Sequence, residues 1–406
     1  MTKLSKENIN ERIINKADLP DPINRLIQEA LSENATDIHI DTLEDVCVIR
    51  FRIGGIIYEN KILTCDEGKR LLNEIKVISG LDIDKTFTPK EGHIEFRQKE
   101  VKENIRVTII PTGDKESAHL RIISKPIEKW DINNLGFCAK DKQKILKALN
   151  SPSGLILVSG QTGTGKTTTL YSLTSTLNLQ TSIGVSIEDP VEFNLPCLRQ
   201  LEVNESHGLT MAEGIKSLLR TDPDIIVVGE IRDKESAITA AKAALAGRLV
   251  IATIHSKSVS DTIDTLHYMS VPYYVIGTVL HMIINQKLVR RLCKKCCKLR
   301  ELSAEEIRVF KNANIKAPKE VSYAVGCDEC NSRGYKRQIG IFEVMISDDN
   351  IRDAISKPLR GQELQNIFIE NGMTPVLSDA LQKVIDGETS FEEISRIFWL
   401  DNNNSN

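Results

Sequence analysis

Leu155-Ile-Leu-Val-Ser-Gly-Gln-Thr-Gly-Thr-Gly-Lys-Thr-Thr168 is the stretch of this chain that decides its fold. It begins with a short apolar run, Leu155–Ser159, of the kind that forms a buried parallel strand. It continues as G-x-x-x-x-G-K followed by threonine, and then opens a helical pattern. Glycines at these positions let the backbone wrap around phosphate groups, with its N–H groups pointing inward at the positive end of a helix dipole. The order strand, loop, helix therefore predicts a phosphate-binding loop rather than a chance glycine-rich turn.

The loop predicted to bind nucleotide consists of Gly160, Gln161, Thr162, Gly163, Thr164, Gly165, Lys166, Thr167 and Thr168. Lys166 is expected to reach the β- and γ-phosphates of ATP, and the Thr167 hydroxyl is expected to hold Mg²⁺. ATP with its magnesium is thus the ligand that this segment predicts.

Strand-like and helical patterns alternate from this loop onward. Strands are expected at 155–159, 183–187, 225–229 and 249–253, and helices at 166–177, 211–219 and 234–245. Such alternation predicts a parallel sheet with helices on both faces. We therefore expect an α/β chain built around a RecA-like P-loop ATPase core.

Acidic residues follow two of these strands. Asp224 to Glu230 is an apolar strand that ends in an acid, the form of a Walker B segment, which places Glu230 at the ligand-binding edge of the sheet. Glu188, Asp189 and Glu192 follow the preceding strand. Glu230 and Glu188 are predicted to be catalytic, although any of these acids could instead be a solvated strand end or a helix N-cap.

His255 follows the strand expected at 249–253 and would reach the same edge. There it could sense the γ-phosphate by hydrogen bonding. A single histidine after a strand is more often incidental, so the pattern alone does not decide its role.

The bulk composition bounds the class of protein. The chain has 406 residues and a formal net charge of -3, which allow about two to four domains and give no general attraction to nucleic acid or anionic lipid. No apolar run approaches the roughly 18–20 residues of a membrane span, and the N-terminus lacks the apolar core of a secretory signal. We expect a cytoplasmic protein that reaches a membrane only through partners.

Changes of pattern divide the chain. An amphipathic helix near residue 21, strand-turn-strand over 37–58 and a helix at 69–79 predict an N-terminal module, and Lys125-Pro126 marks a linker. The expected order is a flexible arm at 1–20, an N-terminal α/β module at 21–126, the ATPase core at 127–288, a zinc subdomain at 289–345 and C-terminal helices at 346–406.

The zinc prediction rests on two C-x-x-C pairs, Cys293 with Cys296 and Cys327 with Cys330, which suit tetrahedral Zn²⁺. Cys296 is preferred over Cys297 because its spacing matches the second pair. Four protein ligands leave no open position, so a structural role is expected. A reduced, metal-free set is the alternative.

The residues around the first pair are basic, and no acid lies among them. They would offset the charge of four thiolates, and a solvated face is favoured over a nucleic-acid contact. These residues are Lys287, Arg290, Arg291, Lys294, Lys295, Lys298 and Arg300.

Together these motifs resemble the secretion ATPase superfamily that powers type II secretion, type IV pilus assembly and competence pseudopili. The resemblance covers roughly residues 20–400. SIEDPVE resembles the family's aspartate box, Arg199–Asp233 its signature, and LVIATIHSKSVSDTIDTLHYM its histidine box, with His255 at the central histidine. ATDIHID and VIRFRIGG resemble the N-terminal module, and GCDECNSRGYKRQIGIFEVM resembles the zinc subdomain.

The resemblance implies a ring hexamer with its active site between the N-terminal module and the core. Arg106 and Arg121 match paired arginines that reach the nucleotide phosphates in the family; without the resemblance both would be ordinary surface arginines on strands. An inner-membrane platform protein is the implied partner, and pilin-like subunits are the indirect cargo. Retraction ATPases of the family lack the zinc module, so its presence favours assembly or secretion.

Three departures from the family bear on nucleotide contact and coupling. Ala246-Gly247-Arg248 stands where the family usually has a TGH segment, Gly54 replaces the acid of an RxDG motif, and Thr265 replaces a common arginine. The phosphate loop and Glu230 are unaffected.

The leading function is a hexameric ATPase motor for pilin or pseudopilin assembly, or for protein secretion. The alternative is a nucleic-acid translocating or packaging RecA-like ATPase, which the basic run supports. Aromatic residues make up only 5% of the chain and form no basic-aromatic stripe, so no nucleic acid is expected as partner. Arg248 and Gly54 make a nucleotide-gated scaffold with little turnover a third hypothesis.

Overall fold

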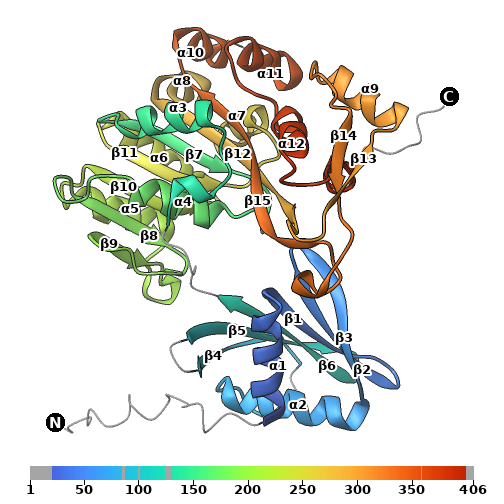
Figure 1. Ribbon diagram of the computed structural model, residues 1–406. Coiled ribbons are helices and arrows are strands. Elements are labelled where there is room, and N and C mark those ends of the chain that lie inside the picture. The colour runs from blue at the N-terminus through green and yellow to red at the C-terminus, as the bar shows by residue number, and fades with distance from the viewer. Residues whose placement is uncertain (1–20, 85–86, 99–100, 124–129, 358, 399–406) are drawn as a thin grey trace, which may run out of the picture. The chain divides into compact units, whose positions relative to one another are not determined.

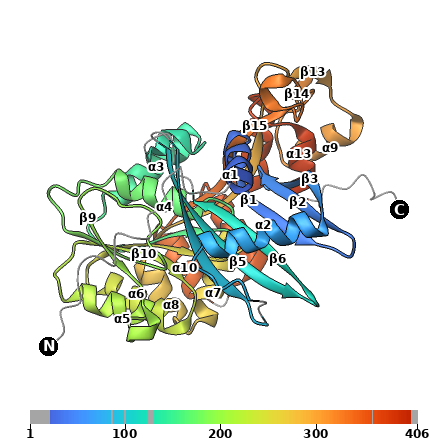
Figure 2. The ribbon, with the colours of Figure 1, turned by 90° about the horizontal axis from the view of Figure 1, so that it is seen from below.

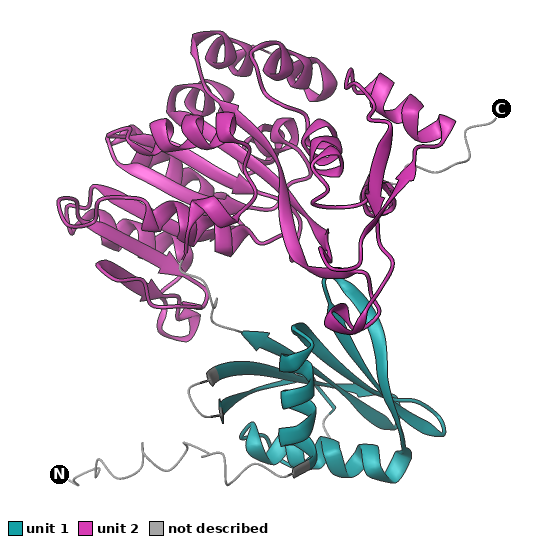
Figure 3. Cartoon of the chain, in the orientation of Figure 1, with its two compact units in different colours: residues 1–127 teal, residues 128–406 magenta. Residues whose placement is uncertain are grey.

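The computed structural model describes residues 21–84, 87–98, 101–123, 130–357 and 359–398 (Figures 1 and 2). The chain forms two compact units, residues 1–127 and 128–406 (Figure 3). The predicted arm at 1–20 and the predicted linker at Lys125-Pro126 lie outside the described residues. None of the helices in the described ranges combines the length and apolar character that a membrane crossing needs.

Unit 1 is a six-stranded antiparallel sheet with the spatial order β3-β2-β1-β6-β5-β4. The strands are β1 (Ala35–Thr42), β2 (Val46–Ile53), β3 (Ile56–Thr64), β4 (Lys90–Gln98), β5 (Val101–Thr112) and β6 (Lys115–Ile123), and the helices are α1 (Asp21–Ser32) and α2 (Cys65–Ile78). The structure confirms the predicted N-terminal α/β module and adds β3, which begins within the segment 37–58.

The period-2 alternation of the strands decides which face of this sheet is apolar. Ile38 and Ile40 of β1 join the core with the buried stripes of α1 and α2. Residues of the opposite face include Arg106 of β5 and Arg121 of β6, which are direct cross-strand partners. Unit 1 therefore has one helix-covered apolar face and one charged face.

Unit 2 is built on a seven-stranded sheet with the order β15-β12-β7-β11-β10-β8-β9. Its strands are β7 (Gly154–Ser159), β8 (Gly184–Glu188), β9 (Leu198–Glu202), β10 (Ile225–Ile231), β11 (Leu249–Ile254), β12 (Leu280–Leu292) and β15 (Tyr335–Ile346). All neighbouring pairs are parallel except β12 with β15, which is antiparallel. The predicted RecA-like sheet is confirmed, with one antiparallel edge strand.

Helices cover both faces of this sheet, as Figure 1 shows. On β7, Leu155 and Leu157 pack with the side that holds α5 (Met211–Leu219), α6 (Lys234–Leu245), α7 (Val259–Tyr268) and α8 (Tyr273–Val279). Ile156 and Val158 of the same strand pack with α3 (Ala139–Leu149) and α4 (Lys166–Ser175). A strand buried on both faces has to be apolar throughout, which is why β7 reads as a continuous apolar run.

The cysteine-containing segment leaves the sheet at the end of β12 and returns as β15. It holds β13 (Lys298–Glu301), α9 (Ala304–Asn312) and β14 (Glu320–Tyr323). β12 continues across residue 288, where the sequence suggests a boundary, and the five-part division of the chain stays a prediction.

The C-terminal region consists of α10 (Asp349–Ser356), α11 (Gly361–Glu370), α12 (Val376–Ile385) and α13 (Phe391–Phe398). Glu393 of α13 links this region to β12. Its buried carboxylate accepts hydrogen bonds from Arg290 N at 3.0 Å and Arg290 Nε at 2.9 Å. The predicted C-terminal helices are thus part of the same unit as the sheet.

Candidate nucleotide site and cysteine cluster

The loop between β7 and α4 has the backbone that its glycines predict. Gly160, Gly163 and Gly165 have positive φ angles of 152°, 77° and 84°. A Cβ atom on Gly160 would lie 2.6 Å from Gln286 O and 2.6 Å from Thr164 Oγ1, so no larger residue fits. Gly165 is the N-cap of α4 and supplies no side-chain cap, which leaves the N–H groups of the first helical turn available to an anion.

Lys166 folds back over this loop. Its Nζ atom lies 3.0 Å from Gly160 O and 3.2 Å from Gln161 O. Burial lowers the pKa of this lysine, and the nearby carboxylate of Glu230 at 4.0 Å acts in the opposite direction. The hydrogen-bond partners of the ammonium group are thus two carbonyl oxygens and His255 Nδ1, which a phosphate group can replace as a stronger partner.

Glu230 lies at the centre of a network that joins four strand ends. Its Oε1 atom is 2.6 Å from His255 Nε2, and its Oε2 atom accepts a hydrogen bond from Arg232. His255 Nδ1 lies 3.0 Å from Lys166 Nζ. A charged lysine can only donate, so His255 accepts at Nδ1 and its Nε2–H donates to Glu230. Arg232 also contacts Asp189 at 3.1 Å.

This network brings together residues that are far apart in the sequence. Lys166, Asp189, Glu230 and His255, all singled out from the sequence, meet at the carboxyl edge of the sheet. Arg232 was not predicted to take part, although it lies in the same signature segment as Glu230. A basic side chain two residues beyond a Walker B acid was the available signal.

Glu188 is placed differently. Its side chain is buried, and Oε1 accepts hydrogen bonds from Ser186 Oγ at 2.6 Å and Gln200 Nε2 at 3.0 Å. Its Oε2 atom accepts a hydrogen bond from Tyr171 of α4, and burial together with this carboxylate raises the pKa of the tyrosine. Both oxygens thus have protein donors, and a catalytic role for Glu188 stays a prediction. Glu192 is exposed.

Gln286 of β12 is a contact to the loop that the sequence did not reveal. Its side chain is buried, Nε2 donates to Thr164 O and Oε1 accepts from Thr169 Oγ1 at 2.7 Å. The neighbouring Asn285 donates to Ser159 Oγ at 3.0 Å. Two adjacent amides directly after the apolar run Met282–Ile284 were the signal, because buried polar groups require partners.

Arg106 and Arg121 lie in unit 1, where they are cross-strand neighbours. Asp37 Oδ1 accepts from Arg121 Nε at 3.0 Å and lies 2.9 Å from His119 Nε2. Although burial opposes it, hydrogen bonds from His119, Thr36 and Arg121 lower the pKa of Asp37. Arg106 is exposed, and its side chain has no hydrogen bond or ion pair with any residue the structure describes. Contact of either arginine with nucleotide stays a prediction.

The four predicted zinc ligands come together in unit 2. The sulfur atoms of Cys293, Cys296, Cys327 and Cys330 all lie within 4.8 Å of one another. Three of the Sγ–Sγ distances are 3.9, 3.8 and 3.8 Å, and a tetrahedron with Zn–S bonds of about 2.3 Å has edges of about 3.8 Å. Cys297 is outside the group, and its Sγ atom lies 3.9 Å from Lys294 O.

Backbone N–H groups favour the thiolate form of Cys330, whereas burial raises the pKa of Cys296 to about 12. Burial raises the pKa of the Cys330 thiol, but N–H groups of Cys327 and Gly334, each 3.2 Å from its sulfur, and the other thiols bring it to about 7. Thiolates are the form that binds metal. The residues therefore fit a tetrahedral metal ion.

The basic run near the cluster is largely paired with acids of the same unit. Arg290, Arg291, Lys295 and Arg300 form ion pairs with Glu393, Glu388, Glu329 and Glu306, respectively. A surface that binds a nucleic-acid backbone presents its cations to phosphates instead. The arrangement therefore weighs against the nucleic-acid alternative.

Residues 14–396 match the model of a family described as type II/IV secretion system protein. The putative type II secretion system protein E of Escherichia coli K12 is 38% identical over 379 residues, which are 92% of this chain and 76% of that protein. The type IV pilus assembly ATPase PilB of Myxococcus xanthus is 35% identical over 402 residues, which are 97% of this chain and 70% of that protein.

Solved structures agree on the fold. The ATPase DotB of Legionella pneumophila aligns over 94% of this chain and 96% of its own, with a TM-score of 0.68 and 21% identity. The pilus retraction motor PilT with bound ADP aligns over 94% of this chain and 97% of its own, with a TM-score of 0.60 and 24% identity.

Replacing Gln286 with leucine should loosen the phosphate loop. Gln286→Leu keeps the side-chain volume but leaves the Thr164 carbonyl and the buried Thr169 hydroxyl without these partners, at a cost of about 1–3 kcal/mol. We expect ATP to bind about tenfold more weakly, as measured by calorimetry. The exposed Gln143 of α3 is the control, and Gln143→Leu should bind ATP normally. Unchanged affinity of Gln286→Leu would contradict the role given to this contact.

Proposed function

This chain belongs to the type II/IV secretion system protein family, and on that premise we propose that it hydrolyses ATP to drive the assembly of pilins or pseudopilins, or protein secretion, through an inner-membrane platform protein. The observation that carries the proposal is the meeting of Lys166, Glu230 and His255 at the open end of a phosphate-binding loop. Its location would be cytoplasmic, at the inner membrane through partners.

The proposed binding step exchanges the partners of Lys166. The β- and γ-phosphates would replace Gly160 O and Gln161 O as acceptors of its ammonium group. The N–H groups of the loop and of the first turn of α4 would hold the remaining phosphate oxygens. The Thr167 hydroxyl would hold Mg²⁺, which neutralises charge on the phosphate oxygens when bound.

Glu230 is the residue proposed to act on the attacking water. Its carboxylate is oriented by His255 and Arg232, so its position is fixed before nucleotide arrives. Once Lys166 and His255 turn to the phosphates, the Oε1 atom of Glu230 is released to accept a hydrogen bond from water. We also assign the γ-phosphate contact to His255, because its ring lies between Lys166 Nζ and the carboxylate of Glu230.

A ring of six chains is part of the proposal, as the resemblance implies. Arg106 and Arg121 are proposed to supply positive charge to the phosphates as negative charge develops on the transferred group. The contact of Arg121 Nε with Asp37 supports this role, because it fixes the side chain through Nε. The side chain of Arg106 forms no hydrogen bond or ion pair with a described residue, so it would break no such contact when it binds the phosphates.

One Zn²⁺ is proposed at Cys293, Cys296, Cys327 and Cys330. Its role would be structural, since four sulfur ligands complete a tetrahedron. It would join the segment that follows β12 to the segment that precedes β15.

The test of the motor proposal is Glu230→Gln. The amide keeps the size of the side chain but accepts protons poorly, so ATP hydrolysis should fall by about 100-fold or more while ATP binding is retained. Phosphate release and calorimetric ATP binding are the measurements. Glu235→Gln, at an exposed position of α6, should hydrolyse ATP at the normal rate. Full turnover in Glu230→Gln would refute the assignment, and stimulation of the unmodified protein by DNA would favour the nucleic-acid alternative.

Metal content tests the cysteine cluster. Elemental mass spectrometry of the digested protein should find one zinc per chain. Cys327→Ser should lose this zinc, because a hydroxyl is a poor replacement for thiolate. Cys297→Ser should retain full zinc, since that sulfur lies outside the group. Zinc-free protein, or equal loss in Cys297→Ser, would show that the ligand assignment is wrong.

A further inference from the structure

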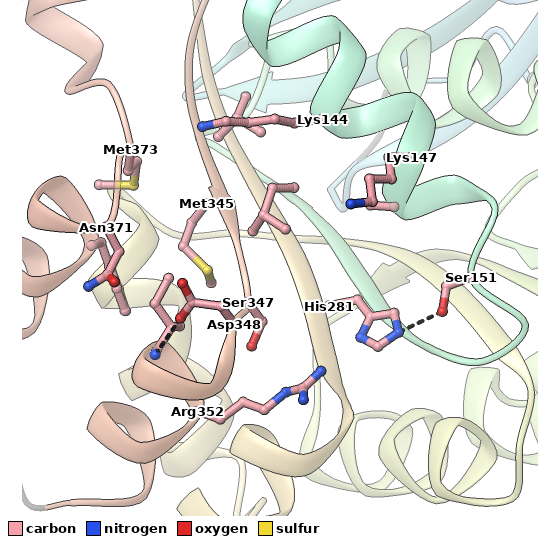
Figure 4. Close-up of a pocket in the computed structure, with 15 residues that line it drawn as sticks. Lys144, Lys147, Ser151, His281, Met345, Ser347, Asp348, Arg352, Asn371 and Met373 are labelled. Carbon is pink, nitrogen blue, oxygen red and sulfur yellow. Dashed lines mark hydrogen bonds between the residues drawn. The ribbon is translucent and has the colours of Figure 1, made fainter.

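A cavity of about 480 Å³ lies in unit 2, between α3, β12, β15 and the helices α10 and α11 (Figure 4). It is separate from the nucleotide site. His281, at the start of β12, lines the cavity, whereas Gln286, further along the same strand, holds the phosphate loop. The two sites thus lie at opposite ends of the parallel strands.

Two basic side chains at this cavity lack a strong acidic partner. The side chain of Lys147 in α3 forms no hydrogen bond or ion pair with any described residue. The Nε atom of Arg352 in α10 is buried and, in the described part of the chain, has no acceptor. Its Nη1 atom contacts Asp349 at 3.1 Å, but that carboxylate is 99% exposed and such ion pairs contribute little.

The acid of the lining offsets only part of this charge. Asp348 is the acid among the lining residues, and its Oδ1 atom accepts from Ile351 N at 2.8 Å as the N-cap of α10. Lys144 adds a third cation, which contacts Gly372 O at 2.9 Å and Asp141 at 3.9 Å. Burial and the charge of Arg352 lower the pKa of His281, which is consistent with a positive potential.

The remaining wall is apolar. Met345 enters from β15, and Met373 lines the same space (Figure 4). Phe368 of α11 also belongs to the lining. All three side chains are buried, and methionine adapts readily to the shape of an apolar or aromatic group. The volume and the mixture of an apolar wall with a few charged groups are typical of small-molecule sites.

We propose that this cavity binds a small organic anion, with its apolar body against Met345, Phe368 and Met373 and its carboxylate or phosphate group between Lys147 and Arg352. The guanidinium group of Arg352, which is partly exposed, and the ammonium group of Lys147 are donors suited to an oxyanion. The site takes no part in the ATPase chemistry proposed above.

The experiment uses three probes that share one apolar body: 2-naphthyl phosphate, 2-naphthoate and neutral 2-naphthol. The full chain, labelled with ¹³C at its six methionine methyl groups, is titrated with each probe and followed by NMR. Both anions should shift the Met345 and Met373 signals, whereas Met211 and Met269, which are outside the lining, should not move. The tighter of the two anions identifies the acid group that the site prefers.

Charge removal separates this site from general apolar binding. Lys147→Gln and Arg352→Gln should each weaken the anions at least tenfold and leave 2-naphthol unchanged, and Lys140→Gln, at an exposed position of α3 outside the lining, should bind normally. Lys147 is exposed, so its replacement does not endanger folding. The proposal is overturned if neither anion shifts Met345 and Met373, if 2-naphthol binds as tightly as the anions, or if both variants bind like the unmodified protein. None of these readouts needs ATP hydrolysis, so they stand apart from the motor proposal.

Discussion

The contact between Glu230 and His255 is the interaction on which the rest of the site depends. It exists because parallel strands end on one edge of a sheet, so that residues at or after the ends of β7, β8, β10 and β11 meet there. The charges within the network are balanced: Lys166 and Arg232 face Glu230 and Asp189, with His255 between them. A triphosphate entering this edge competes for the same cations, and the account of hydrolysis rests on that competition.

β12 is the second organising element, because residues along this strand and directly after it reach four other parts of unit 2. Gln286 holds the phosphate loop, Arg290 is bound by Glu393 of α13, and Cys293, which follows the strand, belongs to the cysteine cluster. His281 at its beginning lines the cavity on the other side. A metal ion on the cysteines would therefore fix the far end of the strand that supports the loop.

The sequence predicts the parts of the fold whose patterns are local. β7, α5, α6 and β11 follow from apolar runs and helical periodicity, and the ranges of α5 and α6 agree with the predicted ones. β12 was not foreseen, because the adjacent Asn285 and Gln286 interrupt its apolar run and their partners lie over one hundred residues away in the sequence. Arg232 is not predictable for the same reason, because its role depends on a contact with Asp189, which is distant in the sequence and follows another strand. The cysteine cluster was predictable because ligand spacing is a local property, whereas the satisfied carboxylate of Glu188 depends on the packing of Tyr171.

The measurement that tests the central claim most directly is ATP binding and hydrolysis by Lys166→Ala beside the unmodified protein. The account predicts that the unmodified chain binds and hydrolyses ATP, and that the variant loses about 100-fold or more of its turnover, because the β- and γ-phosphates lose their lysine partner. If the variant hydrolysed ATP at the unmodified rate, or if the unmodified protein bound no ATP, the loop at Gly160–Thr168 would not be the catalytic nucleotide site.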